Sequence, residues 1–254
     1  MKIRFLGTGT SQGIPVIGCD CDVCKSLDFR DKRFRTSVHI ETKGKSLVID
    51  TGPDFRMQML RAGISQLDSV LFTHEHKDHT AGLDDIRPFN FKQKKDMPIY
   101  GRQQVIDQIK QEFSYIFSDL KYPGVPQVQP HVIDHQNFKV EGIKVIPIPV
   151  MHNKLPVLGF RIGDFTYITD ANFISDQSKK LIAGSKILVL NALQKPPHQS
   201  HFTLHEAIEQ VQSMDVQEAY FTHVSHKLGL HHQIEAELPE GIHLAYDGLE
   251  LNLP

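Results

Sequence analysis

The sequence lacks the features that would place it in a membrane, in a secretory pathway or on a nucleic-acid backbone. No stretch approaches the ~20 consecutive apolar residues that a membrane-spanning helix needs. The N-terminal segment from Met1 to Gly7 has too short an apolar run for a signal peptide. A formal net charge of −2 argues against a protein that binds nucleic acid mainly through phosphate contacts. We therefore expect a cytoplasmic protein with neither a membrane nor a nucleic-acid partner.

Cysteine is also scarce, whereas histidine is abundant. The chain has three cysteines, and all of them lie between positions 19 and 24. An odd number at such close spacing makes a poor disulfide framework. The hydrophobic share of 40% and the charged share of 23% are those of an ordinary globular protein, so the 15 histidines are the compositional outlier.

The pattern of apolar residues predicts a mixed α/β chain. Short or alternating apolar runs are typical of strands, and apolar residues at three- and four-residue spacing are typical of amphipathic helices. The predicted strands are 3–6, 37–41, 46–49, 70–72, 132–133, 138–140, 143–150, 157–162, 165–169, 187–190 and 219–222. The predicted helices are 55–62, 105–117, 176–182 and 204–211. Hairpins followed by β-α-β units fit two sheets with helices on their outer faces.

The residues best suited to chemistry are concentrated in one short stretch after a predicted strand. His74, His76, Asp78 and His79 lie within six positions. Imidazole and carboxylate groups suit divalent ions such as Zn²⁺ or Mn²⁺. His74 and His76 are two residues apart on an extended turn, so both rings can face one ion. Asp78 and His79 come where a helix can begin and can face a second ion. The alternative, a solvated polar turn, fits four such residues in six positions poorly.

Further candidate ligands follow other predicted strands. His152, Asp170 and His223 each come at or just after the end of an apolar strand-like run, as His74 does. Because sites in open sheets form at the carboxyl ends of strands, we expect these side chains to converge. A hydrogen-bonded structural histidine is the alternative for His152 or His223 taken alone. Their shared position after strands favours a site.

The order His-x-His-x-Asp-His, His, Asp, His resembles the signature of the metallo-β-lactamase superfamily of dinuclear metallohydrolases. The resemblance implies a four-layer αβ/βα sandwich with two mixed sheets and the metals at one edge. Asp50 resembles the aspartate of the superfamily's Asp-x-Gly turn, which would orient a ligand histidine. The implied ligand set is His74, His76 and His152 on one metal, Asp78, His79 and His223 on the second, and Asp170 bridging them.

Such a centre suits an anionic phosphate. Two divalent ions bring four positive charges against two carboxylates and a hydroxide, so about one positive charge remains. Metal coordination lowers the pKa of water to roughly neutral, so a hydroxide nucleophile exists at physiological pH. Zn²⁺, Mn²⁺ or Fe²⁺ would serve as the two catalytic metals. Asp78 is counted as catalytic as well as a ligand.

The three cysteines form a second candidate metal site. Cys19, Cys21 and Cys24 give the spacing Cys-x-Cys-x-x-Cys, and a closed structural zinc site needs a fourth ligand. The candidate is His226, three residues beyond His223. Free thiols or a redox cluster are the alternatives. Together with Thr-His-x-Ser-His at 222–226, this motif narrows the resemblance to the cyclic ribose phosphate phosphodiesterases associated with carbon–phosphorus lyase.

His201 is the candidate proton donor. It precedes a predicted helix whose first turn has a capping box formed by Thr203 and Glu206. The N–H groups at a helix start favour a bound anion, so a histidine there could hold phosphate and protonate the leaving alkoxide. The position also resembles a catalytic histidine of the superfamily's phosphodiesterase branch, which includes tRNA 3′-processing enzymes. A histidine on a surface loop is the alternative.

Five polar residues are left without an assigned role. We expect His205 on a helix surface and the pair His231 and His232 at an exposed helix start. His198 is a weaker candidate for the site than His201. Asn191 occupies a strand-end position where relatives often have Asp, so contacts there would differ.

The leading hypothesis is one domain over residues 1–254 that hydrolyses a small phosphodiester, with a cyclic ribose phosphate as the substrate that the resemblance implies. The proline-rich segment 122–130 is predicted to be a loop within this domain, because candidate ligands lie on both sides of it. The alternatives are a thioester or lactone hydrolase on the same centre, a tRNA 3′-processing nuclease and a non-enzymatic metal sensor. Related enzymes imply a homodimer.

Overall fold

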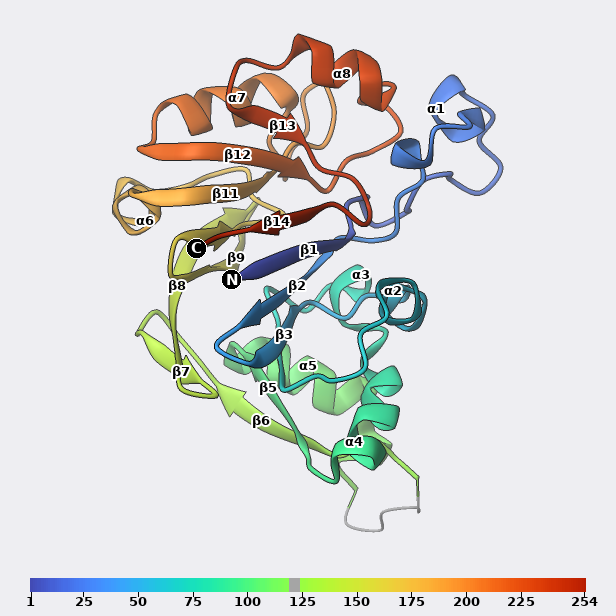
Figure 1. The fold of residues 1–254 in the computed structure, drawn as a ribbon, viewed down its shortest axis with the longest axis vertical. Helices are drawn as coiled ribbons and strands as arrows, with labels where there is room; N and C mark the ends of the chain where they lie inside the picture. Colours follow the sequence, from blue (N-terminus) through green and yellow to red (C-terminus); the bar gives the residue numbers. More distant parts are fainter. Residues whose placement is uncertain (119–123) are drawn as a thin grey trace.

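The computed structural model describes residues 1–118 and 124–254, and their strands form two seven-stranded sheets (Figure 1). In order across the first sheet, the strands are β14 (Glu250–Asn252), β1 (Lys2–Gly7), β2 (Ser37–Thr42), β3 (Lys45–Ile49), β4 (Ser69–Leu71), β5 (Met97–Gly101) and β6 (Val128–Val132). Those of the second are β13 (Ile242–Leu244), β12 (Val216–Thr222), β11 (Ser185–Asn191), β10 (Phe165–Tyr167), β9 (Leu155–Ile162), β8 (Ile143–His152) and β7 (Phe138–Val140).

Both sheets are mixed. In the first sheet β14, β1, β2 and β3 pair antiparallel, and β3 to β6 pair parallel. In the second sheet β7 to β10 pair antiparallel, and β10 to β13 pair parallel. Lys2 lies opposite Asn252, so the two ends of the chain are side by side in one sheet (Figure 1).

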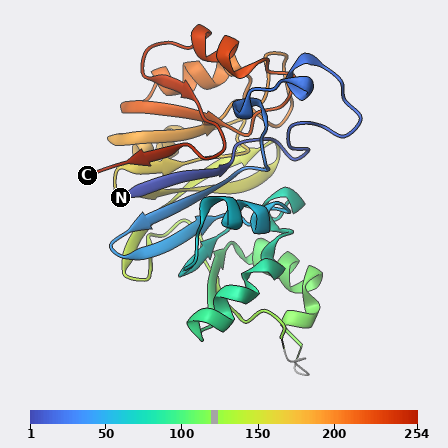
Figure 2. The same cartoon turned by 45° about the vertical axis from the view of Figure 1, so that its right-hand side comes forward.

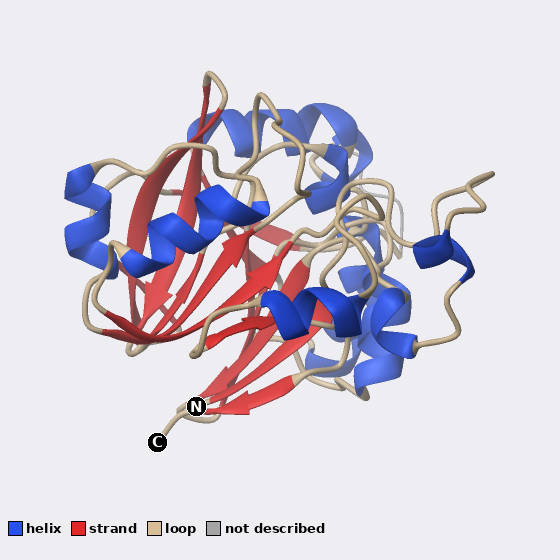
Figure 3. Ribbon diagram, turned by 90° about the horizontal axis from the view of Figure 1, so that it is seen from above, coloured by secondary structure: helices blue, strands red, loops and turns tan. Residues whose placement is uncertain are grey.

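Helices lie on the outer faces of the sheets, as Figure 3 shows with helices in blue and strands in red. The helices of the first half are α2 (Phe55–Ala62), α3 (Lys77–Thr80), α4 (Arg87–Gln93) and α5 (Gln103–Glu112). Those of the second half are α6 (Asp176–Ile182), α7 (Leu204–Gln212) and α8 (His231–Glu237). Among the described residues, no helix has both the length and the apolar character needed to cross a bilayer.

Apolar side chains fill three layers between these elements. Between the two sheets lie residues of both, including Phe5, Val38, Phe160 and Tyr167, each at most 1% exposed. A second cluster packs the second sheet against α6, α7 and α8, and a third packs the first sheet against α2, α4 and α5. Each large apolar side chain buried in this way contributes about 1.5–3 kcal/mol. The four-layer sandwich with two mixed sheets is therefore confirmed.

An N-terminal arm departs from the layers. It runs from Thr10 to Arg33 and includes α1 (Asp22–Lys25) and a 3₁₀ turn, η1 (Phe29–Asp31). In two views this segment stands away from both sheets, near the loops that follow the strands of the second sheet (Figures 1 and 2). Isolated bridges of Gly9 with Arg35 and Val224 hold the start of the arm against both halves of the fold.

Most predicted elements are found within three residues of their expected bounds, with two corrections. The predicted helix 105–117 ends at Glu112, because Phe113 has a ψ of 41° and only a 3₁₀ turn, η3 (Ser114–Ile116), follows. Of the predicted loop 122–130, residues 122 and 123 lie outside the described residues, and 128–130 belong to β6. The predicted strand 132–133 is thus the end of a longer strand, which pairs with β5.

We expect the layer between the sheets to carry much of the stability. Phe160 is 0% exposed there, so Phe160→Ala should lower the free energy of unfolding by about 3–5 kcal/mol through lost burial and a residual cavity. Phe91 on α4 is 63% exposed, so Phe91→Ala should change it by about 0.5 kcal/mol or less. Urea unfolding of both variants at equal metal content measures the difference. Equal losses in the two variants would contradict this account of the core.

Candidate metal centre

The predicted ligands lie where strands end. His74 follows β4 by three residues, His152 is the last residue of β8, and His223 comes directly after β12. Asp170 follows β10 by three residues. These strands belong to both sheets, so the candidate ligands meet at one edge of the sandwich. This is the convergence that the sequence predicts.

Three histidines form the first group. The ligand atoms of His74, His76 and His152 lie within 4.8 Å of one another, and the ring centroids of His74 and His76 are 4.5 Å apart. His152 Nδ1 lies 2.7 Å from the carbonyl oxygen of Ser200, to which it donates, so its Nε2 is free to act as a ligand. His74 is fully buried, while His76 is exposed.

Two carboxylates and two histidines form the second group. Asp78, His79, Asp170 and His223 offer ligand atoms within 4.8 Å of one another. His79 Nε2 lies 3.3 Å from oxygens of both Asp78 and Asp170, and His223 Nε2 lies 3.1 Å from Asp170 Oδ1. Asp170 also belongs to a further group with His152 and His201. Its carboxylate therefore lies near His152 of the first group as well as near the histidines of the second.

Asp50 orients His79 of this second group through a hydrogen bond. Its carboxylate is completely buried and lies 2.7 Å from His79 Nδ1. It also accepts from the N–H of Thr73 at 2.9 Å and from the Thr73 hydroxyl at 2.8 Å. Thr73 Oγ1 in turn lies 3.0 Å from His74 Nδ1 and can accept its proton, which leaves His74 Nε2 as the free nitrogen. One carboxylate thus fixes the tautomer of a histidine in each group.

The donor set fits divalent ions. Nε2 of His74, His79 and His223 is buried and has no hydrogen-bond partner among the described residues. A buried polar atom without a partner costs about 1–3 kcal/mol, so three such nitrogens in one cluster favour a bound group. Neutral imidazole and carboxylate are the donors that Zn²⁺, Mn²⁺ and Fe²⁺ accept.

The pKa shifts of these side chains in the metal-free protein also favour a bound cation. Burial would raise the pKa of Asp170, but the imidazoles of His223 and His79 hold it well below its usual range. Burial lowers the pKa of His74 well below its usual value, and His79 adds to this effect. Burial also acts to lower the pKa of His79, but Asp78 and Asp170 raise it well above its usual value.

Several of these residues have a left-handed backbone. Asp50, Asp170 and His223 have φ of 65°, 55° and 56°, which costs a side chain other than glycine roughly 1 kcal/mol or more. Asn191 supports one of these turns: its Oδ1 accepts from the N–H of Ala171 at 2.7 Å, and its Nδ2 donates to the Ala171 carbonyl at 2.9 Å. This fully buried amide therefore holds the residue after Asp170. It is a positioning role that the sequence did not reveal.

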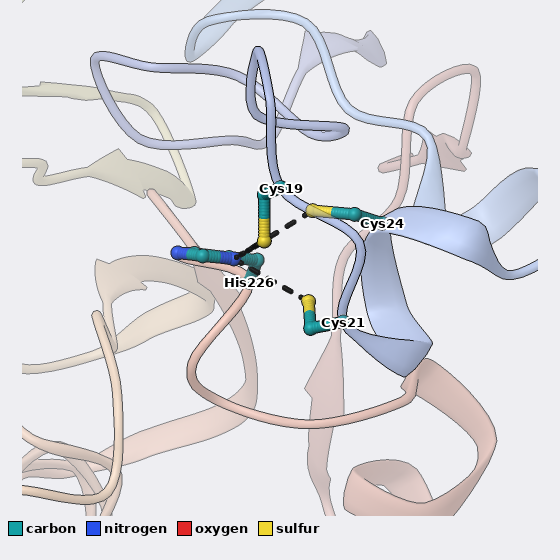
Figure 4. Close-up of side chains that lie close together, drawn as sticks. All are labelled: Cys19, Cys21, Cys24 and His226. Carbon is teal, nitrogen blue, oxygen red and sulfur yellow. Dashed lines mark hydrogen bonds between the residues drawn. The ribbon is translucent and has the colours of Figure 1, made fainter.

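The cysteines and His226 form a separate cluster (Figure 4). The sulfurs of Cys19, Cys21 and Cys24 lie 3.2, 3.5 and 3.6 Å from His226 Nδ1. The backbone hydrogen bond from Cys24 lowers the pKa of Cys21 to about 6, whereas burial raises that of Cys24 to about 11. Three sulfurs and one nitrogen around one point are the donor set of a structural zinc site.

His201 lies beside the metal ligands. Its ring centroid is 4.5 Å from that of His152 and 4.8 Å from that of His223. Burial and the neighbouring His223 lower the pKa of His201 to about 3. The helix after it is α7, and its predicted capping box is confirmed, with both hydrogen bonds present. His201 is 8% exposed, so it is not a histidine on a surface loop.

The remaining histidines are distributed differently. His198 is exposed, with its ring 5.1 Å from that of His201, and His205 is an exposed helix residue paired with Glu209 at 3.1 Å. The expectation of an exposed pair at the start of α8 is wrong for His231, which is 2% exposed. Its Nδ1 lies 3.1 Å from Nη2 of Arg33, because the arm covers this helix start. His232 is exposed, as expected.

Comparison with known proteins gives three informative relatives. The family model of the Beta-lactamase superfamily domain matches residues 45–224. A crystal structure described as a new diphosphatase from the PhnP family has a TM-score of 0.93 and 40% identity, covering 100% of this chain and 98% of its own. An octanoyltransferase of Porphyromonas gingivalis is 40% identical over 98% of this chain and 51% of its own length. A ribonuclease Z of Methanosarcina mazei is 28% identical over 64% of this chain and 48% of its own length. The chain thus spans about half the length of these curated relatives.

Asp50→Asn tests whether the Asp50 carboxylate orients His79 for metal binding. The amide would place an N–H₂ group against His79 and favour the tautomer that carries its proton on Nε2, so we expect metal affinity to fall about 10–100-fold. Competition with a chromogenic zinc chelator measures the affinity. Asp68→Asn is the control, since Asp68 is a 3% exposed carboxylate that contacts Ser46 and Lys95 instead of a candidate ligand. An unchanged affinity in Asp50→Asn would contradict the role given to Asp50.

Cys24→Ser tests the cysteine cluster separately. We expect this variant to lose one equivalent of zinc while the histidine and carboxylate groups keep theirs, because the two clusters share no ligand. The arm should also be cleaved faster in limited proteolysis, since the cluster ties it to the loop after β12. Elemental analysis beside wild type measures the loss. The same zinc content in both proteins would show that the cluster holds no metal.

Proposed function

Because this chain belongs to the PhnP family of the β-lactamase superfamily, we propose that it is a metal-dependent phosphodiesterase that hydrolyses a small phosphodiester at the Asp170 centre. The family match and the similar crystal structure make the chain a metallo-hydrolase with the metallo-β-lactamase fold. The observation that supports phosphodiester hydrolysis in particular is the position of Asp170. Its carboxylate lies in the group of His79 and His223, forms a further group with His152 of the first candidate metal, and lies 3.8 Å from His201 Nδ1.

Two divalent ions would be held by the ligand groups described above, one by the group of His74 and one by the group of His79, with Asp170 between them. When bound, such ions supply an activated water and positive charge for the phosphate oxygens. Asp78 and Asp170 would remain ionised beside them, since their neighbours hold both pKa values below the usual range despite burial. The ligand histidines would bind as neutral imidazoles oriented by Asp50, Thr73 and the Ser200 carbonyl.

His201 would act on the leaving side of the phosphorus. Its Nδ1 is buried and has no hydrogen-bond partner among the described residues. A neutral imidazole still donates one N–H, and α7 begins three residues later with its own N–H groups. An anionic substrate beside the ring would raise its proton affinity and allow His201 to protonate an alkoxide leaving group. Phosphate binding and proton transfer are thus proposed for one side chain.

A second candidate function is diphosphate hydrolysis. It is favoured by the 40% identical relative that is described as a diphosphatase and is matched over 98% of its length. Attack at phosphorus and a positively charged centre serve both reactions, so the two differ in the leaving group. The ribonuclease Z relative is matched over less than half of its length and favours a nuclease less. The ratio of kcat/KM for a nucleoside diphosphate sugar and for a cyclic nucleotide decides between the two candidates.

Replacement of His201 tests the proton-donor role. His201→Gln should lower kcat about 10²–10⁴-fold on 2′,3′-cyclic AMP, whose leaving group is an alkoxide that needs a proton. The loss should be much smaller on bis-p-nitrophenyl phosphate, because its phenolate leaves without one. Steady-state kinetics of the metal-loaded enzyme on both substrates measures the contrast. His205→Gln changes an exposed histidine of the same helix region and is the control. Equal losses on both substrates would assign His201 to phosphate binding alone, and no loss would exclude it from the reaction.

A further inference from the structure

His223 differs from the other buried ligand histidines in what orients its ring. The others have a hydrogen-bond partner at Nδ1, which fixes the ring and leaves Nε2 for a metal: His74, His79 and His152. Both ring nitrogens of His223 are buried and have no hydrogen-bond partner among the described residues. The direction of this imidazole therefore depends on the backbone that carries it.

The backbone at His223 is held by the turn that follows β1. His223 has a φ of 56°, a left-handed conformation that its surroundings must maintain. The next residue, Val224, donates its N–H to the Thr8 carbonyl at 2.9 Å and accepts from the N–H of Thr10 at 3.0 Å. Gly9, between those two, forms a parallel bridge with Val224. One turn thus binds both backbone groups of Val224 and restricts the dihedral angles of His223.

Two buried charges fix the side chain of Thr8 in this turn. Thr8 is completely buried, and its hydroxyl donates to Asp247 Oδ1 at 2.8 Å and accepts from Arg33 Nη1 at 2.8 Å. A hydroxyl has one proton to donate, so these two contacts define its direction. Asp247 and Arg33 are both buried, and hydrogen bonds to ionised groups are stronger than those between neutral ones.

Asp247, which lies between β13 and β14, also reaches the turn by a second route. Its Oδ2 accepts from the N–H of Phe34 at 2.7 Å, and the Phe34 carbonyl accepts from the N–H of Gly9 at 2.8 Å. Burial raises the pKa of Asp247 to about 6, while the bonds from Phe34 and Thr8 and the charge of Arg33 oppose this shift. At neutral pH one ionised carboxylate therefore holds the turn through a side chain and through the backbone.

We propose that Asp247 is a positioning residue for His223 and acts on it through the turn after β1 and through Val224. It directs the imidazole toward the second candidate metal. Its role resembles that of Asp50 for His79, except that it acts through the backbone instead of through the ring. The inference concerns metal binding, so it goes beyond the proposed function and holds whichever substrate is hydrolysed.

Two variants interrupt the network at different points. Thr8→Val removes the hydroxyl but keeps the shape of the side chain, and Asp247→Asn leaves one acceptor oxygen for two donors. In each variant we expect one metal of the loaded protein to bind about tenfold more weakly, because a poorly oriented His223 is a weaker ligand. Competition of the loaded protein with a chromogenic zinc chelator measures this affinity. Thr8→Ser keeps the hydroxyl and should restore the wild-type affinity.

A double-mutant cycle shows whether the effect passes through His223. In a His223→Ala background the ligand is already absent, so the addition of Thr8→Val should weaken metal binding no further. Thr166→Val is the matched control, since it removes a completely buried hydroxyl on β10 that contacts Ser185 Oγ at 2.7 Å. It should leave the metal affinity unchanged, and urea unfolding compares the stability that each variant loses.

The outcomes decide the inference. Wild-type affinity in Thr8→Val would overturn it, and this variant with Thr8→Ser decides the question if Asp247→Asn does not fold. Equal losses from Thr8→Val with and without His223 would also overturn it, because the effect would then bypass that ligand. So would a similar loss in Thr166→Val, which would assign the effect to stability alone. The test uses no substrate, so a lack of phosphodiester turnover would overturn the proposed function and leave this inference intact.

Discussion

The hydrogen bonds of the buried Asp50 carboxylate are the contacts on which the site depends. They join the end of β3 to the turn after β4, and they fix the tautomers of His79 directly and of His74 through Thr73. Taking this charge out of water is costly, and burial raises the pKa of Asp50. Three donors and the raised proton affinity of His79 offset that cost. The carboxylate therefore orders ligands of both candidate metals from a position that no substrate reaches.

Packing of the layers of the sandwich places the other candidate ligands. The core between the sheets brings the ends of β4, β8, β10 and β12 to one edge, although these strands are far apart in the sequence. At that edge Asp170 and His223 adopt left-handed backbone, and the Asn191 amide clamps Ala171 beside Asp170. Packing energy from the core can maintain such local strain, which is common where side chains must point at a ligand.

The N-terminal arm completes the site from outside the sheets. The cysteines bring it to His226, and a buried network around Arg33 fixes its other end. Arg33 donates to the Thr8 hydroxyl and the Ala245 carbonyl, and its neighbour Asp31 accepts from the N–H of His231. The arm thus contacts the same loop after β12 that carries His223. Thr10 and Gln12 at the start of the arm line a recess of about 250 Å³ together with His201 and Lys227.

The sequence by itself determined the features that depend on residues within a single segment of the chain. The spacing from His74 to His79, the three cysteines, the capping box of α7 and the apolar periods of most strands and helices are local patterns, and each has a physical meaning on its own. Only the tertiary structure decided what depends on contacts between distant segments. The pairing of β14 with β1, the burial of His231 beneath the arm, the clamp made by Asn191 and the recess around Lys227 are of this kind. Each joins groups separated by many residues. Neither the period of apolar residues nor the spacing of a motif shows which distant residue a side chain will contact.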